Sequence, residues 1–247
     1  MRMALLADVH ANLEAFQACL DHARDRQADR HAFLGDLVGY GADPRPVVEL
    51  VMRSVDTGSV AVLGNHDQAV ARGPSSSMTP EASQAVQWTQ GQLTAAQLKF
   101  LGSLPLMVEE GSALYVHANA WDPASWEYLT SSQDVGRSLA ATPCRQTFCG
   151  HVHRPALYHL SPGGMVARFD PVPGMGIPLG TRRRWLAIAG SVGQPRDGIP
   201  AASYALFDDQ TAVLTFFRVP YDTAEAARKV RAAGLPEALG RRLEDGS

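Results

Sequence analysis

Several features that define other classes of protein are scarce in this sequence of 247 residues. No run of about 18 apolar residues occurs, so we expect no transmembrane helix. The apolar start of the chain ends at Asp8, which is too early for a signal peptide. The three cysteines (Cys19, Cys144 and Cys149) have neither the C-x-x-C spacing of a structural zinc site nor the pairs of a disulfide framework. Reduced thiols predict a cytoplasmic protein.

Charged residues are also scarce. Only 19% of the residues are charged, and 22 basic residues against 25 acidic ones give a net charge of −3. This balance argues against a broad nucleic-acid surface and against binding to an anionic membrane, but it permits a local anion site. Apolar residues make up 45% of the chain, which excludes whole-chain disorder.

The order of apolar patterns predicts the α/β class. Short apolar runs alternate with amphipathic stretches in the first two-thirds, and strands joined by turns follow residue 155. No linker is visible, so we expect one domain over residues 1–240 and a frayed tail over 241–247. A Gly/Pro/Ser-rich segment over 69–78 predicts a loop. Strands are expected near residues 3–7, 31–34, 60–63, 106–108, 113–116, 147–149, 156–160, 165–169, 185–189, 203–207 and 212–218, with helices after Asn12, Asp43, Thr94 and Asp222.

Residues that can bind metals stand directly after the predicted strands. In open α/β sheets the carboxyl ends of strands meet at one crevice, so side chains distant in sequence can converge there. The residues are Asp8 and His10 after the first strand, Asp36 after the second, Asn65, His66 and Asp67 after the third, His117 after the hairpin, and His151 and His153 after 147–149.

This set is too large for a single ion. Imidazole and carboxylate ligands together suit zinc, iron, manganese and similar divalent ions. Two of the three carboxylates, the amide and four of the five histidines fit two ions about 3.5–4 Å apart that share a carboxylate. Two divalent ions, less two carboxylates and a bridging hydroxide, leave a charge of about +1, which attracts phosphate.

At this point the sequence resembles a known family, the calcineurin-like metallophosphoesterases. The family pattern D-x-H, G-D, G-N-H-[DE], H, G-H-x-H occurs in order between residues 8 and 153. The resemblance implies a four-layer α-β-β-α sandwich with two central mixed sheets. The matching residues are Asp8-Val9-His10, Gly35-Asp36, Gly64-Asn65-His66-Asp67, His117 and Gly150-His151-Val152-His153.

The resemblance also implies roles for these residues. The first metal would be held by Asp8, His10, Asp36 and His153, and the second by Asp36 as the bridge with Asn65, His117 and His151. His66 matches a histidine that is not a ligand and that protonates the leaving oxygen or stabilises phosphoryl charge. Asp67 is the candidate to orient the His66 imidazole.

One segment departs from the serine/threonine protein phosphatases of this family. Where they read G-D-x-V-D-R-G, this chain has Gly39 and Tyr40, so the phosphate-gripping arginine and its neighbouring aspartate are absent. The surroundings of Asp8 and the segment from Gly190 to Gly198 look closer to small bacterial and archaeal phosphodiesterases and diadenosine tetraphosphatase-like proteins.

The substrate-binding residues are open between two interpretations. Asn12 could donate to phosphate or cap a helix, and Arg196 could neutralise phosphate or form a structural salt bridge. Trp121, Trp126 and Tyr128 follow His117 and could stack a nucleobase or pack their loop onto the domain.

The sequence thus predicts a hydrolase that cleaves a small phosphodiester or a nucleotide-type phosphoanhydride. The resemblance implies that a hydroxide bridging two metal ions attacks phosphorus, with His66 assisting the leaving group. The expected cofactors are two divalent ions such as manganese, iron or zinc, and the expected partner is a small phosphorylated substrate. The alternatives are a serine/threonine-type protein phosphatase and a non-catalytic metal-binding scaffold of the same fold.

Overall fold

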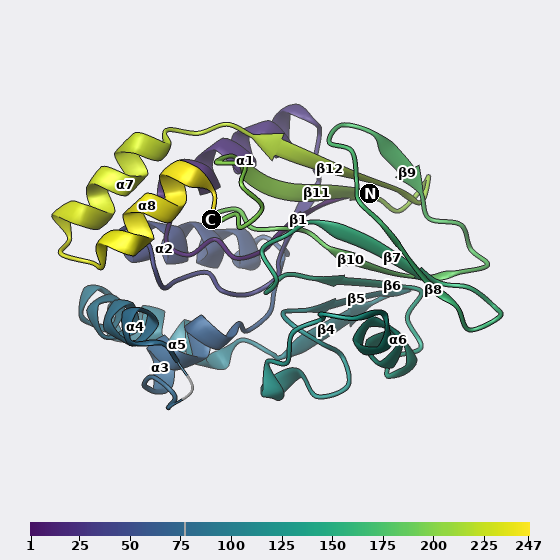
Figure 1. Ribbon diagram of the computed structural model, residues 1–247, viewed down its shortest axis with the longest axis horizontal. Coiled ribbons are helices and arrows are strands. Elements are labelled where there is room, and N and C mark those ends of the chain that lie inside the picture. The colour runs from purple at the N-terminus through teal and green to yellow at the C-terminus, as the bar shows by residue number, and fades with distance from the viewer. Residues whose placement is uncertain (77) are drawn as a thin grey trace.

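The computed structural model describes residues 1–76 and 78–247, and within these the chain forms two six-stranded sheets that pack face to face. Helices cover the outer face of each sheet (Figure 1). The α/β class and the four-layer α-β-β-α arrangement with two mixed sheets are therefore confirmed.

The first sheet contains the N-terminal strand near its centre. β1 pairs in parallel with β2 and antiparallel with β11, which makes the sheet mixed. In spatial order its strands are β3 (Val60–Ala61), β2 (Arg30–Phe33), β1 (Arg2–Leu6), β11 (Ala202–Asp208), β12 (Val213–Val219) and β9 (Gly176–Pro178).

The second sheet is built from the middle of the chain. β6 pairs in parallel with both β5 and β10, whereas the remaining neighbours are antiparallel. In spatial order its strands are β4 (Met107–Glu110), β5 (Ala113–Val116), β6 (Gln146–Cys149), β10 (Arg184–Ile188), β7 (Ala156–Leu160) and β8 (Val166–Phe169).

Helices on the first sheet outnumber those on the second. α1 and α7 pack on the first sheet's side, and α6 packs on the second sheet, while α3, α4 and α5 gather beside α2 (Figure 1). The helices are α1 (Leu13–Asp25), α2 (Pro44–Asp56), α3 (Asn65–Arg72), α4 (Pro80–Gln92), α5 (Ala95–Ser103), α6 (Ser132–Ala140), α7 (Thr223–Ala232) and α8 (Glu237–Asp245), with a 3-10 turn over Pro123–Ser125.

Three buried clusters hold the layers together. Alternate residues of β1 face opposite sides, as a strand requires. Leu6 packs with Phe16 of α1, whereas Leu5 packs with Phe148 of the second sheet. A third cluster joins α6, through Leu139, to that sheet's outer face.

The strand directions bring distant loops to one edge of the sandwich. β1, β2 and β3 run parallel to one another, as do β5 and β6. The segments that follow these strands therefore leave from the same ends of their sheets, where open α/β sheets usually place their binding sites.

Three parts of the chain differ from the sequence predictions. α3 continues to Arg72, so the predicted loop over 69–78 begins later, and Ser77 of that loop lies outside the described residues. β9 was not predicted. The expected frayed tail is wrong for residues 241–245, because they belong to α8, whose Leu243 is buried against α7.

None of the helices in residues 1–76 and 78–247 has the length and apolar character needed to cross a bilayer.

Candidate metal centre

Five loops at one edge of the sandwich supply the predicted metal ligands. Asp8 and His10 follow β1, Asp36 follows β2, and Asn65 opens α3 after β3. From the second sheet, His117 follows β5, and His151 and His153 follow β6. All of the carboxylates and imidazoles in this set are at least 95% buried.

The predicted ligands form two groups. The side chains of Asp8, His10 and His153 offer ligand atoms within 4.8 Å of one another, and so do those of Asp36, His117 and His151. Asn65 joins the second group, because its Oδ1 lies 3.1 Å from Nε2 of His117.

Asp36 lies between the two groups. Its Oδ2 is 3.7 Å from Nε2 of His10 and 3.4 Å from Nε2 of His117. Its Oδ1 accepts a hydrogen bond of 2.8 Å from the backbone N–H of His66, which holds the carboxylate in place. This position suits the bridging role that the family resemblance implies.

Backbone carbonyl groups fix the orientation of all four histidines. In each ring one nitrogen donates to a carbonyl oxygen, so the other nitrogen faces the site with a free lone pair. The donor–acceptor pairs are Nδ1 of His10 with Val38 at 3.2 Å, Nδ1 of His117 with Leu34 at 2.8 Å, Nε2 of His151 with Trp126 at 2.9 Å, and Nδ1 of His153 with Gln194 at 2.6 Å.

The free nitrogens approach one another closely. Nε2 of His10 lies 3.1 Å from Nε2 of His153, and Nε2 of His117 lies 3.0 Å from Nδ1 of His151. Two lone pairs at this distance repel each other unless a cation or a proton lies nearby. The donor set therefore fits divalent metal ions, in agreement with the ligand types.

The backbone of the ligand loops is strained. Positive φ angles of 48–66° occur at Asp8, His10, Asp36, His151 and His153. This left-handed conformation is uncommon outside glycine and costs of order 1–3 kcal/mol per residue, so such residues cluster at functional sites. The left-handed backbone thus lowers the local stability of these loops, and it directs the ligand side chains into the site.

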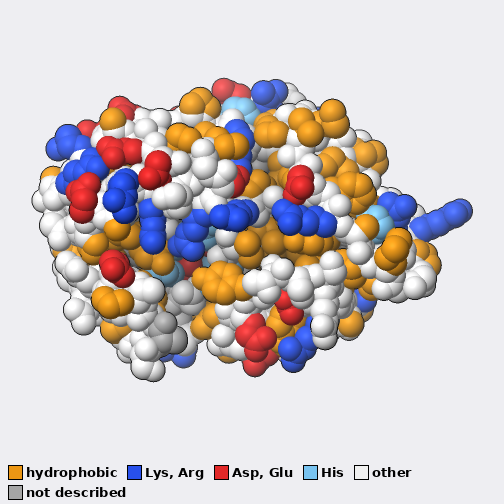
Figure 2. All heavy atoms as spheres, viewed as in Figure 1, with side chains coloured by type: hydrophobic (Ala, Val, Ile, Leu, Met, Phe, Trp, Pro, Cys, Tyr) orange, Lys and Arg blue, Asp and Glu red, His pale blue; other side chains and the backbone are white. Residues whose placement is uncertain are grey.

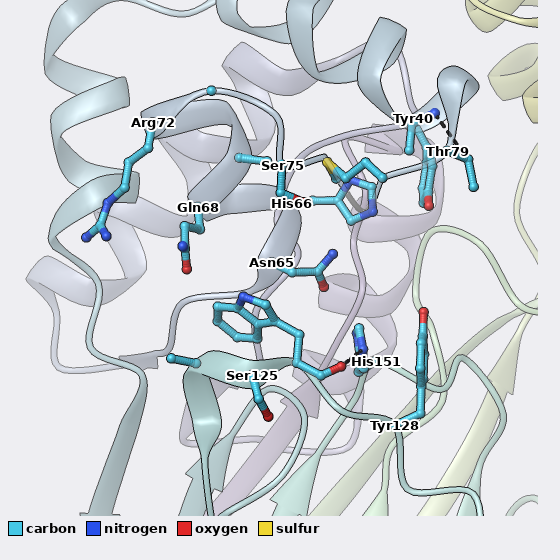
Figure 3. Close-up of a pocket in the computed structure, with 16 residues that line it drawn as sticks. Tyr40, Asn65, His66, Gln68, Arg72, Ser75, Thr79, Ser125, Tyr128 and His151 are labelled. Atoms are coloured by element: carbon cyan, nitrogen blue, oxygen red, sulfur yellow. Dashed lines mark hydrogen bonds between the residues drawn. The ribbon is translucent and has the colours of Figure 1, made fainter.

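A cavity of about 560 Å³ opens beside the second ligand group. It is lined by Asn65, His66 and His151 at one end and by residues of α3 and of the loop after β5 (Figure 3). A row of basic side chains crosses the middle of the molecular face drawn in Figure 2, next to a hollow in which histidine is visible. Asn65 and His151 of the second ligand group therefore border a cavity that a small molecule can enter.

The profile of the calcineurin-like phosphoesterase superfamily domain matches residues 1–212. This chain belongs to the calcineurin-like phosphoesterases. The metal-dependent chemistry of that family agrees with the two ligand groups. The protein is thus a metallophosphoesterase, a hydrolase, as the sequence predicts.

Similar proteins cover the whole chain. An uncharacterised protein of Methanocaldococcus jannaschii is 36% identical over 248 residues, which span 98% of this chain and 96% of the relative. The crystal structure of a metallophosphoesterase from Sphaerobacter thermophilus has 37% identity and a TM-score of 0.88, covering 100% and 99% of the two chains. A hypothetical protein from Pyrococcus horikoshii shares the fold at 19% identity, with a TM-score of 0.79 and coverage of 100% and 98%.

Buried charges in the phosphoesterase site favour bound cations. Burial, together with the nearby Asp36 carboxylate, raises the pKa of Asp8 to about 8. Burial also opposes ionisation of Asp36, but the imidazoles of His117 and His66 hold the pKa of Asp36 well below its ordinary value. Although burial disfavours the charged imidazole, Asp36 raises the pKa of His117 to about 9. Protons therefore occupy the metal-free site at neutral pH.

Metal uptake at pH 7 is accordingly expected to release protons, because Asp8 and His117 must lose theirs before they bind an ion. The apparent affinity should strengthen as pH rises from 7 to 9 and level off above the pKa of His117. Calorimetry in two buffers with different ionisation enthalpies measures the protons released. Uptake without proton release at pH 7 would contradict these pKa shifts.

His66 differs from the predicted ligands in its surroundings. Its Nδ1 is buried and has no hydrogen-bond partner among the described residues. Its ring contacts that of Tyr40, with centroids 4.4 Å apart. A Cβ atom on Gly39, whose φ is +89°, would come within 2.6 Å of Nδ1. Glycine at position 39 is what leaves room for the imidazole.

The prediction that Asp67 orients His66 is wrong. The Asp67 carboxylate instead accepts backbone N–H groups, from Leu37 at 2.8 Å, Val38 at 3.1 Å and Gly64 at 3.1 Å. Since these donors come from the loop after β2 and from the start of α3, Asp67 ties together the segments that carry Asp36 and His66. Asp67 is a positioning residue.

The three aromatic residues after His117 divide into two sets. Trp126 and Tyr128 line the cavity, and the Tyr128 ring stacks on that of His151 at 4.0 Å. Trp121 packs against the α6 cluster with the Arg137 guanidinium 4.6 Å from its ring. Trp121 therefore packs its loop onto the domain, whereas Trp126 and Tyr128 face the cavity.

Asn12 and Arg196 differ in how their side chains are engaged. Oδ1 of Asn12 accepts from Ala15 at the start of α1, and its Nδ2 donates to Gly193, so this side chain serves as a helix cap. Arg196 donates to Oε1 of Gln194 at 2.9 Å and forms no ion pair with a described carboxylate. Its guanidinium lies 5.8 Å from the Tyr40 ring centroid, which leaves its charge available near the ligands.

Two polar cavity residues on α3 were not predicted from the sequence. Gln68 and Arg72 line the cavity from α3. Their spacing of three and seven residues from Asn65 is a helical one and would have placed them on the same face as that ligand. Because a loop was predicted over 69–78, Arg72 was not assigned to the helix that carries Asn65.

Proposed function

We propose that this protein hydrolyses a small phosphodiester or a nucleotide-type phosphoanhydride at a centre of two divalent ions. Asp8, His10, Asp36 and His153 would hold one ion, and Asp36, Asn65, His117 and His151 the other. The observation that carries the proposal is the pair of ligand groups on either side of the Asp36 carboxylate.

The bound ions would supply Lewis acidity that polarises the phosphoryl group and lowers the pKa of the attacking water. Asp36 balances their charge, and the carbonyl groups behind the histidines keep the ligand nitrogens aimed at the site. The strained loops pre-organise this arrangement before the substrate arrives.

His66 is the candidate proton donor to the leaving oxygen. Burial lowers the pKa of its imidazole, so the ring is neutral at pH 7 in the free protein. An anionic phosphate beside the His66 ring would favour the protonated ring, because opposite charges stabilise each other. His66 can then give its proton to the departing alcohol or phosphate.

Arg196 is the candidate to neutralise charge on the phosphate. Tyr40 occupies the place of the arginine in the protein phosphatases, and the Arg196 guanidinium lies beside the Tyr40 ring. Tyr128, on the opposite side of the site, also feels the positive charge of Arg196, which opposes the effect of burial on its pKa. A cation from the β10–β11 connection would thus replace the missing one.

A metal titration tests the proposed function. The purified protein is treated with chelator and then given manganese, zinc or iron, and hydrolysis of bis-p-nitrophenyl phosphate and p-nitrophenyl phosphate is followed. We expect no hydrolysis in chelator and a metal-dependent activity that favours the diester. Hydrolysis of the monoester alone would favour a phosphatase, and no hydrolysis with any ion would favour the scaffold alternative.

Replacement of Trp126 by alanine is expected to raise the Michaelis constant for a nucleotide substrate roughly 5- to 150-fold. Stacking of a base on an aromatic ring contributes ~1–3 kcal/mol, and Trp126 lines the cavity. The hydrogen bond from His151 survives, because its acceptor is the main-chain carbonyl of Trp126.

Steady-state kinetics with the nucleotide and its abasic analogue measure this effect. The abasic analogue has no base to stack, so its Michaelis constant should stay the same in Trp126→Ala. Trp121→Phe, in which a ring still packs under Arg137, is the matched control and should behave like the wild type. Equal losses with both substrates would mean that Trp126 only shapes its loop.

A further inference from the structure

One wall of the cavity is a face of α3 that leads away from the metal ligands. Asn65, Gln68, Ala69 and Arg72 line the cavity at helical spacing. Figure 3 shows Asn65, Gln68 and Arg72 following one another along this wall, with Tyr40 and Tyr128 at the other end. Seven residues at ~1.5 Å each put the Arg72 backbone about 10 Å along the helix axis from that of Asn65.

The cavity is suited to an anion along its whole length. Among its described lining residues there is no Asp, Glu or Lys, and Arg72 is the permanently charged side chain. The Arg72 side chain is exposed, and within residues 1–76 and 78–247 its guanidinium forms no hydrogen bond or ion pair. Its five N–H donors and its charge are therefore available to a phosphate.

We propose that Arg72 binds a second phosphate group of the substrate while the scissile phosphate lies at the metal ligands. This inference rests on the proposed function, because it takes the metal centre as the place of reaction. Because the Asn65 and Arg72 backbones are about 10 Å apart along α3, we take the substrate to be a nucleotide whose second phosphate is separated from the scissile one by a nucleoside.

The residues between the two ends suit a nucleoside. The Gln68 amide, which can donate and accept hydrogen bonds, lines the cavity between Asn65 and Arg72. Trp126 lines the same cavity and offers an aromatic face for a base. A base and sugar at this point would leave the terminal phosphate toward Arg72.

A purely structural role for Arg72 predicts different behaviour. Arg72 is in the last turn of α3, where a cation interacts favourably with the helix dipole. Its replacement would then lower the melting temperature without changing the relative affinity for ligands with one or two phosphates. Ligand preference therefore separates the two roles.

Equilibrium binding tests the proposal directly. Titration calorimetry of the manganese-loaded protein compares adenosine 3′,5′-bisphosphate with adenosine 5′-monophosphate. We expect the wild type to bind the bisphosphate about tenfold more tightly, which corresponds to ~1.4 kcal/mol. Arg72→Gln should bind the two nucleotides equally, and Arg72→Lys should keep part of the preference because it keeps the charge.

Arg53→Gln is the matched control for charge. Arg53 is an exposed arginine in the last turn of α2 and does not line the cavity, so this variant should keep the wild-type preference. Equal wild-type affinity for the two nucleotides would overturn the proposal. A preference that persists in Arg72→Gln, or that disappears in Arg53→Gln as well, would also overturn it.

The proposed function is measured separately in the same preparation. Hydrolysis of bis-p-nitrophenyl phosphate by the wild type needs no second phosphate and reports only on the metal centre. Hydrolysis without a bisphosphate preference would contradict the Arg72 site alone. A preference that depends on Arg72 in a protein without hydrolase activity would contradict the proposed function and leave the Arg72 site supported.

Discussion

Asp36→Asn is expected to lower turnover roughly 10³-fold or more and to reduce the bound metal to less than half of the wild-type content. Each bound ion contributes several kcal/mol of charge stabilisation, and 1.36 kcal/mol is a factor of ten in rate. Asp36 is the carboxylate that lies within 3.7 Å of histidines from both ligand groups. Its loss should cost more than that of any other ligand.

The variant should still fold, because the asparagine oxygen can accept the hydrogen bond from His66 N–H that Asp36 accepts. Metal analysis and single-substrate kinetics on the same preparation measure the two effects. Asp56→Asn, an exposed substitution in the last turn of α2, is the matched control and should match the wild type. Full metal content in Asp36→Asn would show that Asp36 is not the shared ligand.

His66→Ala is expected to lower kcat by roughly 10²–10⁴, the usual contribution of a positioned acid. The metal content should be unchanged, because His66 is not needed to complete either ligand group. The loss should be smaller for esters of p-nitrophenol, a good leaving group, than for esters of an ordinary alcohol. Kinetics with both types of ester, together with metal analysis, test this role.

A different outcome would reassign His66. Its imidazole lies within ligand distance of His10 and Asp36, so loss of metal from His66→Ala would make it a ligand rather than an acid. His31→Ala, at the start of β2 and away from the site, is the matched control for loss of an imidazole. An equal effect with good and poor leaving groups would exclude protonation by His66.

The convergence of the predicted ligands could be anticipated from the sequence because each of them directly follows a strand. Parallel neighbours such as β1 and β2 end at the same edge, so position along the chain translates into position in space. The left-handed φ angles of residues such as Asp8 and His151 could not be predicted in this way. They arise from contacts between loops, including the hydrogen bonds that the Asp8 carboxylate accepts from His151 N–H.

The wrong or missing predictions concern residues whose environment depends on tertiary contacts. Asp67 is next to His66 in sequence, but its carboxylate binds backbone N–H groups thirty residues away. Trp121 and Trp126 are the same residue type and both follow His117, so the sequence does not distinguish them. A 3-10 turn and the left-handed backbone at Trp126 place the two side chains in different surroundings. α8 carries few apolar residues, and its Leu239 and Leu243 become a buried face only beside α7.

Elemental analysis measures directly how many ions the proposed centre binds in each chain. The protein is stripped with chelator, reconstituted separately with manganese, zinc and iron, freed of excess ion and analysed for metal per chain. We expect about two ions per chain with at least one of these metals. Less than one ion per chain with all three metals would contradict a centre of two ions.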